Sequence, residues 1–203
     1  MYRNAFIVFE GGEGCGKTTQ AKDLANRLRR LGFPVVLTHE PGGTPLGNKL
    51  RRWVKWGRGV TIQTELFLFL ASRSQLVNKV IHPALEKGSI VVCDRFDAST
   101  LAYQGYGRGM DLNFLKTVNS FVNDGLSPDL VVLLDISAEQ GLERKRMKLD
   151  VFEREEFFFH QRVRGGYLEM AAADPERWIV VDGTLPAEKI REIIWERVSQ
   201  LLG

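Results

Sequence analysis

The chain has 203 residues, of which 44% are hydrophobic, and a formal net charge of +3. This size and composition predict one domain with a full core over residues 1–203. The charge is too small to indicate nucleic-acid binding, the apolar runs are too short to span a membrane, and the first residues lack a signal-peptide core. We therefore expect a cytoplasmic protein with neither a nucleic-acid nor a membrane partner.

The first expected strand, residues 5–9, leads through a glycine-rich turn into a helical pattern that stops near Gly32. Inside the turn, Gly-x4-Gly-Lys-Thr fits a phosphate-binding loop, and the flanking strand and helix are its usual context. Glycines let backbone N–H groups point inward, and the helix N-terminus adds positive potential. We expect a nucleoside triphosphate to bind this loop, which comprises Gly11, Gly12, Glu13, Gly14, Cys15, Gly16, Lys17, Thr18 and Thr19.

Further strands are expected at residues 33–38, 90–93, 130–134 and 178–181, with helical patterns between them and at 187–202. Asp111 is placed to cap one helix, and Ser137 with Gln140 fits a capping box for the next. The alternation predicts an α/β fold with a parallel sheet of about five strands and helices on both faces. The loops after the strands would then share one edge of the sheet, where such folds bind ligands.

A second polar cluster follows the strand expected at residues 90–93. Asp94 at the strand end can hold Mg²⁺ directly or through water, and Thr18 of the loop can hold the same ion. Arg95 offers a bidentate fork for a second phosphate, although a structural Asp–Arg ion pair is the alternative. Two phosphate-handling centres on one edge indicate transfer between two phosphorylated molecules.

A phosphate-binding loop alone also occurs in switches, motors and transporters. A guanine-specific GTPase would need Asn/Thr-Lys-x-Asp late in the chain, and the segment at residues 78–81 lacks the aspartate. That alternative is therefore weaker than a kinase.

Four segments, residues 10–19, 40–44, 69–73 and 94–104, together resemble the bacterial type of thymidylate kinase, and the resemblance covers essentially the whole chain. It implies a P-loop NTPase fold with a short lid at about residues 142–156. It also implies Mg²⁺-dependent transfer of the γ-phosphoryl group of ATP to thymidine monophosphate (dTMP) for dTTP synthesis, by a homodimer.

The resemblance also implies roles for individual residues around the acceptor nucleotide. Glu13 would accept a hydrogen bond from the sugar 3′-hydroxyl, Phe69 would stack on thymine, and Arg73 would donate to a base carbonyl. Arg95 would bind the acceptor phosphate, and Arg51 is a further candidate for it. The remaining substrate contacts would come from Ser99 and Thr100 at the pyrimidine edge, Tyr103 beside the sugar 2′ position, and Gln104 near the same pocket.

Catalysis would consist mainly of positioning and charge neutralisation by Mg²⁺ at Asp94, by Lys17, by Arg95 and by lid arginines. The chain departs from the family pattern in the lid, because Val151 stands where bacterial members usually carry an arginine. We expect Arg146 to substitute for it and Arg144 to stack near adenine.

Two alternatives stay open from the sequence. Another nucleotide or deoxynucleoside kinase of the same fold would share Lys17 and Asp94 but take a different acceptor. A non-catalytic nucleotide-binding switch would bind ATP without acceptor-dependent release of ADP.

Overall fold

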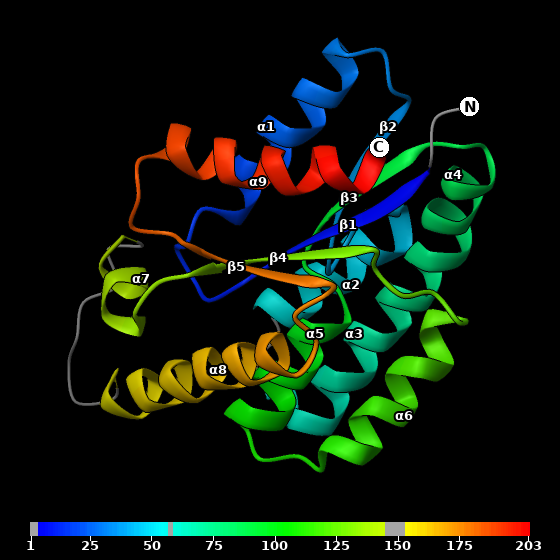
Figure 1. Cartoon of the computed structure of the whole chain (residues 1–203). Helices are drawn as coiled ribbons and strands as arrows, with labels where there is room; N and C mark the ends of the chain where they lie inside the picture. The colour runs from blue at the N-terminus through cyan, green and yellow to red at the C-terminus, as the bar shows by residue number, and fades with distance from the viewer. Residues whose placement is uncertain (1–3, 57–58, 145–152) are drawn as a thin grey trace.

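The computed structural model describes residues 4–56, 59–144 and 153–203, and its centre is a five-stranded parallel sheet (Figure 1). The strands run in the order β2-β3-β1-β4-β5, so the expected five-stranded parallel sheet is confirmed. Their bounds are β1 (Ala5–Glu10), β2 (Val35–His39), β3 (Ile90–Asp94), β4 (Leu130–Asp135) and β5 (Trp178–Asp182).

Helices cover both faces of the sheet, as expected, with α1 and α9 on one face and α3, α6 and α8 on the other (Figure 1). Within the described residues they are α1 (Lys17–Arg30), α2 (Pro45–Trp56), α3 (Ile62–Leu76), α4 (His82–Glu86), α5 (Asp97–Thr100), α6 (Leu112–Asn123), α7 (Ala138–Arg144), α8 (Glu153–Ala173) and α9 (Ala187–Leu202), with two π-helical segments, η1 (Val77–Ile81) and η2 (Leu101–Gly107).

Side chains of β1 alternate between two cores. Ile7 and Phe9 pack with α1 and α9, whereas Phe6 and Val8 pack with η1 and α4. Because successive strand residues point to opposite faces, a wholly apolar strand belongs at the centre of a sheet covered on both sides. This central position of β1 places the turn that follows it between the loops after β3 and β4.

Local signals in the sequence coincide with the observed helix ends. Gly32 follows α1 with a φ of 88°, in the left-handed region that favours glycine. The Asp111 carboxylate accepts the N–H of Phe114 at 2.7 Å, and the Ser137 hydroxyl accepts the N–H of Gln140 at 3.2 Å. Both predicted caps are therefore confirmed.

The long helical pattern at residues 61–78 ends differently from its expectation. The α-helix stops at Leu76, and the chain continues as a π-helical segment to Ile81 before α4 begins. A second π-helical segment, η2, carries Tyr103 and Gln104, and such segments often occur at functional sites. No helix within the described part of the chain is long and apolar enough to cross a membrane.

Most of the expected lid lies outside the described residues. Arg146 and Val151 both fall between α7 and α8, in the range 145–152 that the structure does not describe. Arg144 is the last residue of α7 and is described.

Candidate functional site

The phosphate loop connects β1 to α1 and packs tightly against its neighbours. Gly11 has a φ of 141° and Gly14 a φ of 68°. A β-carbon at Gly11 would lie 2.4 Å from the Leu134 carbonyl oxygen, and one at Gly14 would lie 2.4 Å from the Gly141 carbonyl oxygen. Both backbone conformation and space therefore require glycine, and the loop rests on the end of β4 and on α7.

Lys17, the first residue of α1, turns back over this loop. Its ammonium group donates to the carbonyl oxygens of Gly11 at 3.0 Å and Gly12 at 2.6 Å, and lies 3.3 Å from the Cys15 sulfur. Burial lowers the pKa of Lys17, and the nearby positive charge of Arg95 lowers it further. A phosphate group at the loop would offer this buried ammonium a stronger partner than the carbonyls.

Thr18, in the first turn of α1, meets Asp94, the last residue of β3. The Thr18 hydroxyl donates a hydrogen bond to the Asp94 carboxylate. A hydroxyl and a carboxylate beside a phosphate site are the oxygen ligands that Mg²⁺ accepts, together with phosphate oxygens and water. The two residues thus fit the metal role that the sequence predicts for them.

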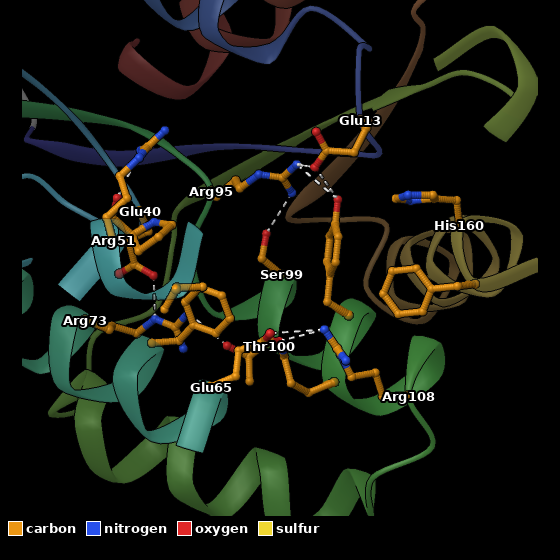
Figure 2. Close-up of a pocket in the computed structure, with 16 residues that line it drawn as sticks. Glu13, Glu40, Arg51, Glu65, Arg73, Arg95, Ser99, Thr100, Arg108 and His160 are labelled. Carbon is orange, nitrogen blue, oxygen red and sulfur yellow. Dashed lines mark hydrogen bonds and ion pairs between the residues drawn. The ribbon is translucent and has the colours of Figure 1, made fainter. Parts of the chain in front are cut away.

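Arg95 follows Asp94 with a φ of 73°, one of two described non-glycine residues in the left-handed region. Its guanidinium donates to the Glu13 carboxylate at 2.8 Å and to the Tyr103 hydroxyl at 3.1 Å. The other terminal nitrogen, Nη1, donates to the Gly11 carbonyl oxygen at 3.2 Å and to the Ser99 hydroxyl oxygen at 3.2 Å. Figure 2 shows this side chain between Glu13 and Ser99.

Two cavities adjoin at this arginine. One of about 470 Å³ lies over α3 and η2, and one of about 790 Å³ lies along the phosphate loop (Figure 2 shows the first). Both are lined by Glu13, Glu40, Pro41, Arg51 and Arg95. The two cavities therefore lie next to each other and share these five lining residues.

Seven predicted substrate residues line the smaller cavity besides Glu13, namely Phe69, Arg73, Arg95, Ser99, Thr100, Tyr103 and Gln104. Phe69 and Arg73 come from one face of α3, and Arg95 to Gln104 come from the segment after β3. The larger cavity is lined by most of the predicted loop residues, Glu13, Gly14, Cys15, Gly16, Lys17, Thr18 and Thr19, and by Asp94.

Arg73 is almost fully buried and is held by protein groups on three sides. Its Nε donates to Glu40 at 2.8 Å, Nη1 donates to Asn119 at 2.7 Å, and Nη2 donates to Thr100 at 3.0 Å. Burial raises the pKa of Glu40 to about 7, although Arg73 opposes this rise. Among the described residues, none offers a hydrogen-bond partner to the second carboxylate oxygen of Glu40, Oε1.

Two further polar side chains, Glu65 and Arg108, line the smaller cavity near η2. The Glu65 carboxylate accepts from Gln104 at 3.1 Å and from Arg108 at 3.1 Å. Glu65 thus holds Gln104 through a hydrogen bond. Its ion pair with Arg108 places a cation at the wall of the cavity (Figure 2).

Arg144 does not line either cavity described above. Its Nη1 donates to the Gly183 carbonyl oxygen at 3.1 Å, which joins the end of α7 to the loop after β5. A β-carbon at Gly183 would lie 3.4 Å from the Cys15 carbonyl oxygen, so Arg144 is held beside the phosphate loop.

Several polar residues of the site were not singled out individually from the sequence. Four of them, Glu10, Glu40, Glu65 and Tyr167, pair with predicted residues, and the fifth, Arg108, pairs with Glu65. Glu10 and Glu40 stand in recognisable segments, but only their burial indicates a role, and burial depends on the assembled sheet.

The chain matches a family model described as thymidylate kinase over residues 9–194. The thymidylate kinase of Dehalococcoides mccartyi strain CBDB1 is 52% identical over 201 residues, which cover 98% of this chain and 97% of the relative. That of Thermomicrobium roseum is 48% identical, with 97% and 95% covered. A crystal structure of thymidylate kinase from Ehrlichia chaffeensis matches with a TM-score of 0.83 at 32% identity, covering 97% of this chain and 99% of that one.

Proposed function

The chain belongs to the thymidylate kinase family, and from this premise we propose how its two cavities carry out the reaction. It transfers the γ-phosphoryl group of ATP to dTMP, giving dTDP and ADP for dTTP synthesis. Membership of this family favours neither of the two alternatives that the sequence left open, another nucleotide or deoxynucleoside kinase and a non-catalytic nucleotide-binding switch.

One observation carries the assignment of substrates to cavities: the two cavities adjoin at Arg95 and Glu13. The ATP phosphates occupy the larger cavity, because the loop N–H groups, the N-terminus of α1 and Lys17 offer donors there. The smaller cavity takes dTMP, with Phe69 stacked on the base, since aromatic faces are the usual partners of nucleobases.

Arg73 and Thr100 read the pyrimidine edge in this arrangement. The Arg73 guanidinium has five N–H donors, and four of them bond to protein groups, which leaves one for a base carbonyl. Tyr103 lies beside the sugar and disfavours a 2′-hydroxyl group, and Glu13 accepts a hydrogen bond from the 3′-hydroxyl group. Ser99 and Gln104 line the same cavity.

Transfer is then a direct displacement. An oxygen of the acceptor phosphate attacks the γ-phosphorus, the bond from that phosphorus to the bridging oxygen of ADP breaks, and ADP keeps the electron pair. The phosphate monoester is already a nucleophile, so the site needs no general base. Arg95 binds the acceptor phosphate, Lys17 binds the donor phosphates, and both stabilise the charge that spreads over the transferring group.

We further assign Mg²⁺, which neutralises phosphate charge when bound, to Thr18 and Asp94. Arg144 lies beside adenine, and Arg146 is the proposed replacement for the missing lid arginine. The single kinase domain of residues 1–203 and a cytoplasmic location are parts of the same proposal.

A homodimer is also part of the proposal, and exposed apolar side chains on two packed helices support it. Phe67 on α3 is 59% exposed, and Phe114 and Phe121 on α6 are 44% and 86% exposed. Phe114 and Phe121 are seven residues apart and therefore share one face of α6. A second copy of this chain would remove this surface from water.

The assignment of cavities is tested by measuring release of ADP from Mg-ATP with each nucleoside monophosphate, for the wild type and for Arg95→Lys. We expect a strong preference for dTMP and a large loss of turnover in Arg95→Lys, because lysine cannot fork across two phosphate oxygens. Unchanged turnover in Arg95→Lys would contradict the role of Arg95.

A further inference from the structure

Glu10, the last residue of β1, is completely buried, with 0% of its surface exposed. It stands directly before the phosphate loop, yet it is not among the described residues that line either cavity. A buried carboxylate is costly unless hydrogen bonds satisfy it. Its position calls for a reason other than contact with a nucleotide.

Four hydrogen-bond donors surround the two carboxylate oxygens of Glu10. Oε1 accepts the backbone N–H groups of Phe96 at 2.8 Å and Ser99 at 3.2 Å. Oε2 accepts the hydroxyl groups of Ser99 at 2.7 Å and Tyr167 at 2.8 Å. These donors belong to the start of α5 and to α8, so this one carboxylate joins β1 to two helices.

The same two hydroxyl groups contact Arg95. Its Nη1 donates to the Ser99 oxygen at 3.2 Å and to the Tyr167 oxygen at 3.3 Å. A hydroxyl group has a single hydrogen, so a hydroxyl that donates to Glu10 presents its lone pairs to the guanidinium. The Ser99 and Tyr167 hydroxyl oxygens also lie 2.8 Å apart. When both hydrogens point to Glu10, both hydroxyl groups act as acceptors for Arg95.

Glu10 also helps to hold the backbone around Arg95. A φ of 73° is uncommon for a residue with a side chain, and it persists only where neighbouring contacts impose it. The Arg95 N–H donates to the Phe9 carbonyl oxygen at 2.9 Å, and the next N–H, that of Phe96, donates to Glu10. The last two residues of β1 thus anchor the chain on both sides of the unusual torsion angle.

We propose that Glu10 is a positioning residue for phosphoryl transfer, which holds the Arg95 guanidinium where the two cavities meet. It acts through Ser99, Tyr167 and the backbone of Phe96, and it contacts neither substrate. The inference rests on the proposed role of Arg95 at the acceptor phosphate. Placement of positive charge supplies most of the catalysis in this chemistry, so a small displacement of Arg95 is costly.

The first test is Glu10→Gln, which keeps the shape of the side chain but replaces one acceptor oxygen by a donor. We expect kcat to fall about 100-fold, the effect of a displacement near 1 Å, while KM for ATP stays close to the wild-type value. The matched control is Asp129→Asn, because the Asp129 carboxylate accepts the N–H of Phe6 at 2.7 Å at the opposite end of β1. This control should keep the wild-type kcat.

A second variant and a double-mutant cycle separate positioning from general damage to the fold. Tyr167→Phe removes one hydroxyl and leaves Ser99 on Glu10, so we expect a smaller loss of kcat with the fold intact by circular dichroism. In an Arg95→Lys background, Glu10→Gln should lower kcat by less than about 3-fold, because its effect passes through Arg95. An equal loss in both backgrounds would overturn the proposal.

The outcomes distinguish this inference from the function on which it rests. Wild-type turnover in Arg95→Lys would mean that the role of Arg95 is wrong. A loss in Arg95→Lys, with wild-type kcat in both Glu10→Gln and Tyr167→Phe, would overturn only the positioning role of Glu10. If Glu10→Gln does not fold, Tyr167→Phe alone and combined with Arg95→Lys decides between these results.

Discussion

At the residue scale, Glu40 and Arg73 form a buried pair beside the smaller cavity, and this pair makes the stability of the fold depend on pH. Both residues are almost fully removed from water, and burial raises the pKa of Glu40 to about 7. In the unfolded chain this carboxyl has its ordinary pKa near 4.5. Between these two values the folded state holds a proton that the unfolded state has lost, so the free energy of unfolding falls as pH rises and levels off above pH 7.

We therefore expect that Glu40→Gln makes stability less dependent on pH. In urea unfolding at pH 5 and pH 7.5, the wild type should lose about 2 kcal/mol more than Glu40→Gln between the two conditions. Glu196→Gln, on an exposed surface of α9, is the control and should keep the wild-type difference. Identical losses in the wild type and Glu40→Gln would show that Glu40 titrates in its ordinary range.

Some residues of the site could be predicted from the sequence and others could not. Lys17 and Thr18 belong to a contiguous motif with its own strand and helix, so their placement at the loop follows from local order. Glu10 and Tyr167 meet only because β1 and α8 pack together, and neither has a local signal. Their contact depends on the tertiary structure, and no local pattern in a single sequence predicts it.

At the element scale, α7 rests on the phosphate loop through a contact between two glycines. A β-carbon at Gly141 would lie 2.4 Å from the Glu13 carbonyl oxygen, just as one at Gly14 would approach Gly141. This helix therefore packs directly on the loop that we propose binds ATP. Neither glycine can carry a side chain unless the helix or the loop moves.

Gly141→Ala should consequently lower turnover by roughly 100-fold or less, in proportion to how far Glu13 and the loop are displaced. The measurement is kcat and KM for both nucleotides, with thermal unfolding to monitor the fold. Gly165→Ala on α8 is the control, since no described atom beyond the neighbouring helix backbone lies within 4 Å of a β-carbon there. Wild-type kinetics in Gly141→Ala would show that the helix yields without disturbing the loop.

The elements themselves were largely predictable, because strand periodicity and helix caps are local. Asp111 and Ser137 mark helix starts that the structure confirms. The π-helical segments were not predictable, since one extra residue in a turn leaves no periodic trace in a short stretch. One of them carries Tyr103 and Gln104, so the expectation for these two residues came from the family resemblance and not from helix geometry.

At the scale of the whole molecule, the exposed phenylalanines of α3 and α6 (Phe67, Phe114 and Phe121) are the reason to expect a dimer. An exposed apolar patch rimmed by polar residues commonly marks an interface. We expect Phe121→Glu to convert the proposed dimer into a monomer in analytical ultracentrifugation, because a buried carboxylate would have no partner there. Leu31→Glu, at an apolar residue that is 51% exposed at the end of α1, should remain a dimer. A wild-type protein that sediments as a monomer would contradict the dimer itself.

The strand order has a consequence for how the molecule acquires activity. β1 pairs with β3 and β4, so the two phosphate-handling segments become neighbours only after distant parts of the chain have come together. Contacts of this kind close long loops and form slowly during folding. The Arg95 N–H bound to the Phe9 carbonyl oxygen is one such contact. Regained phosphoryl transfer after dilution from denaturant is therefore a reporter of completed sheet assembly, whereas recovered helical content can precede it.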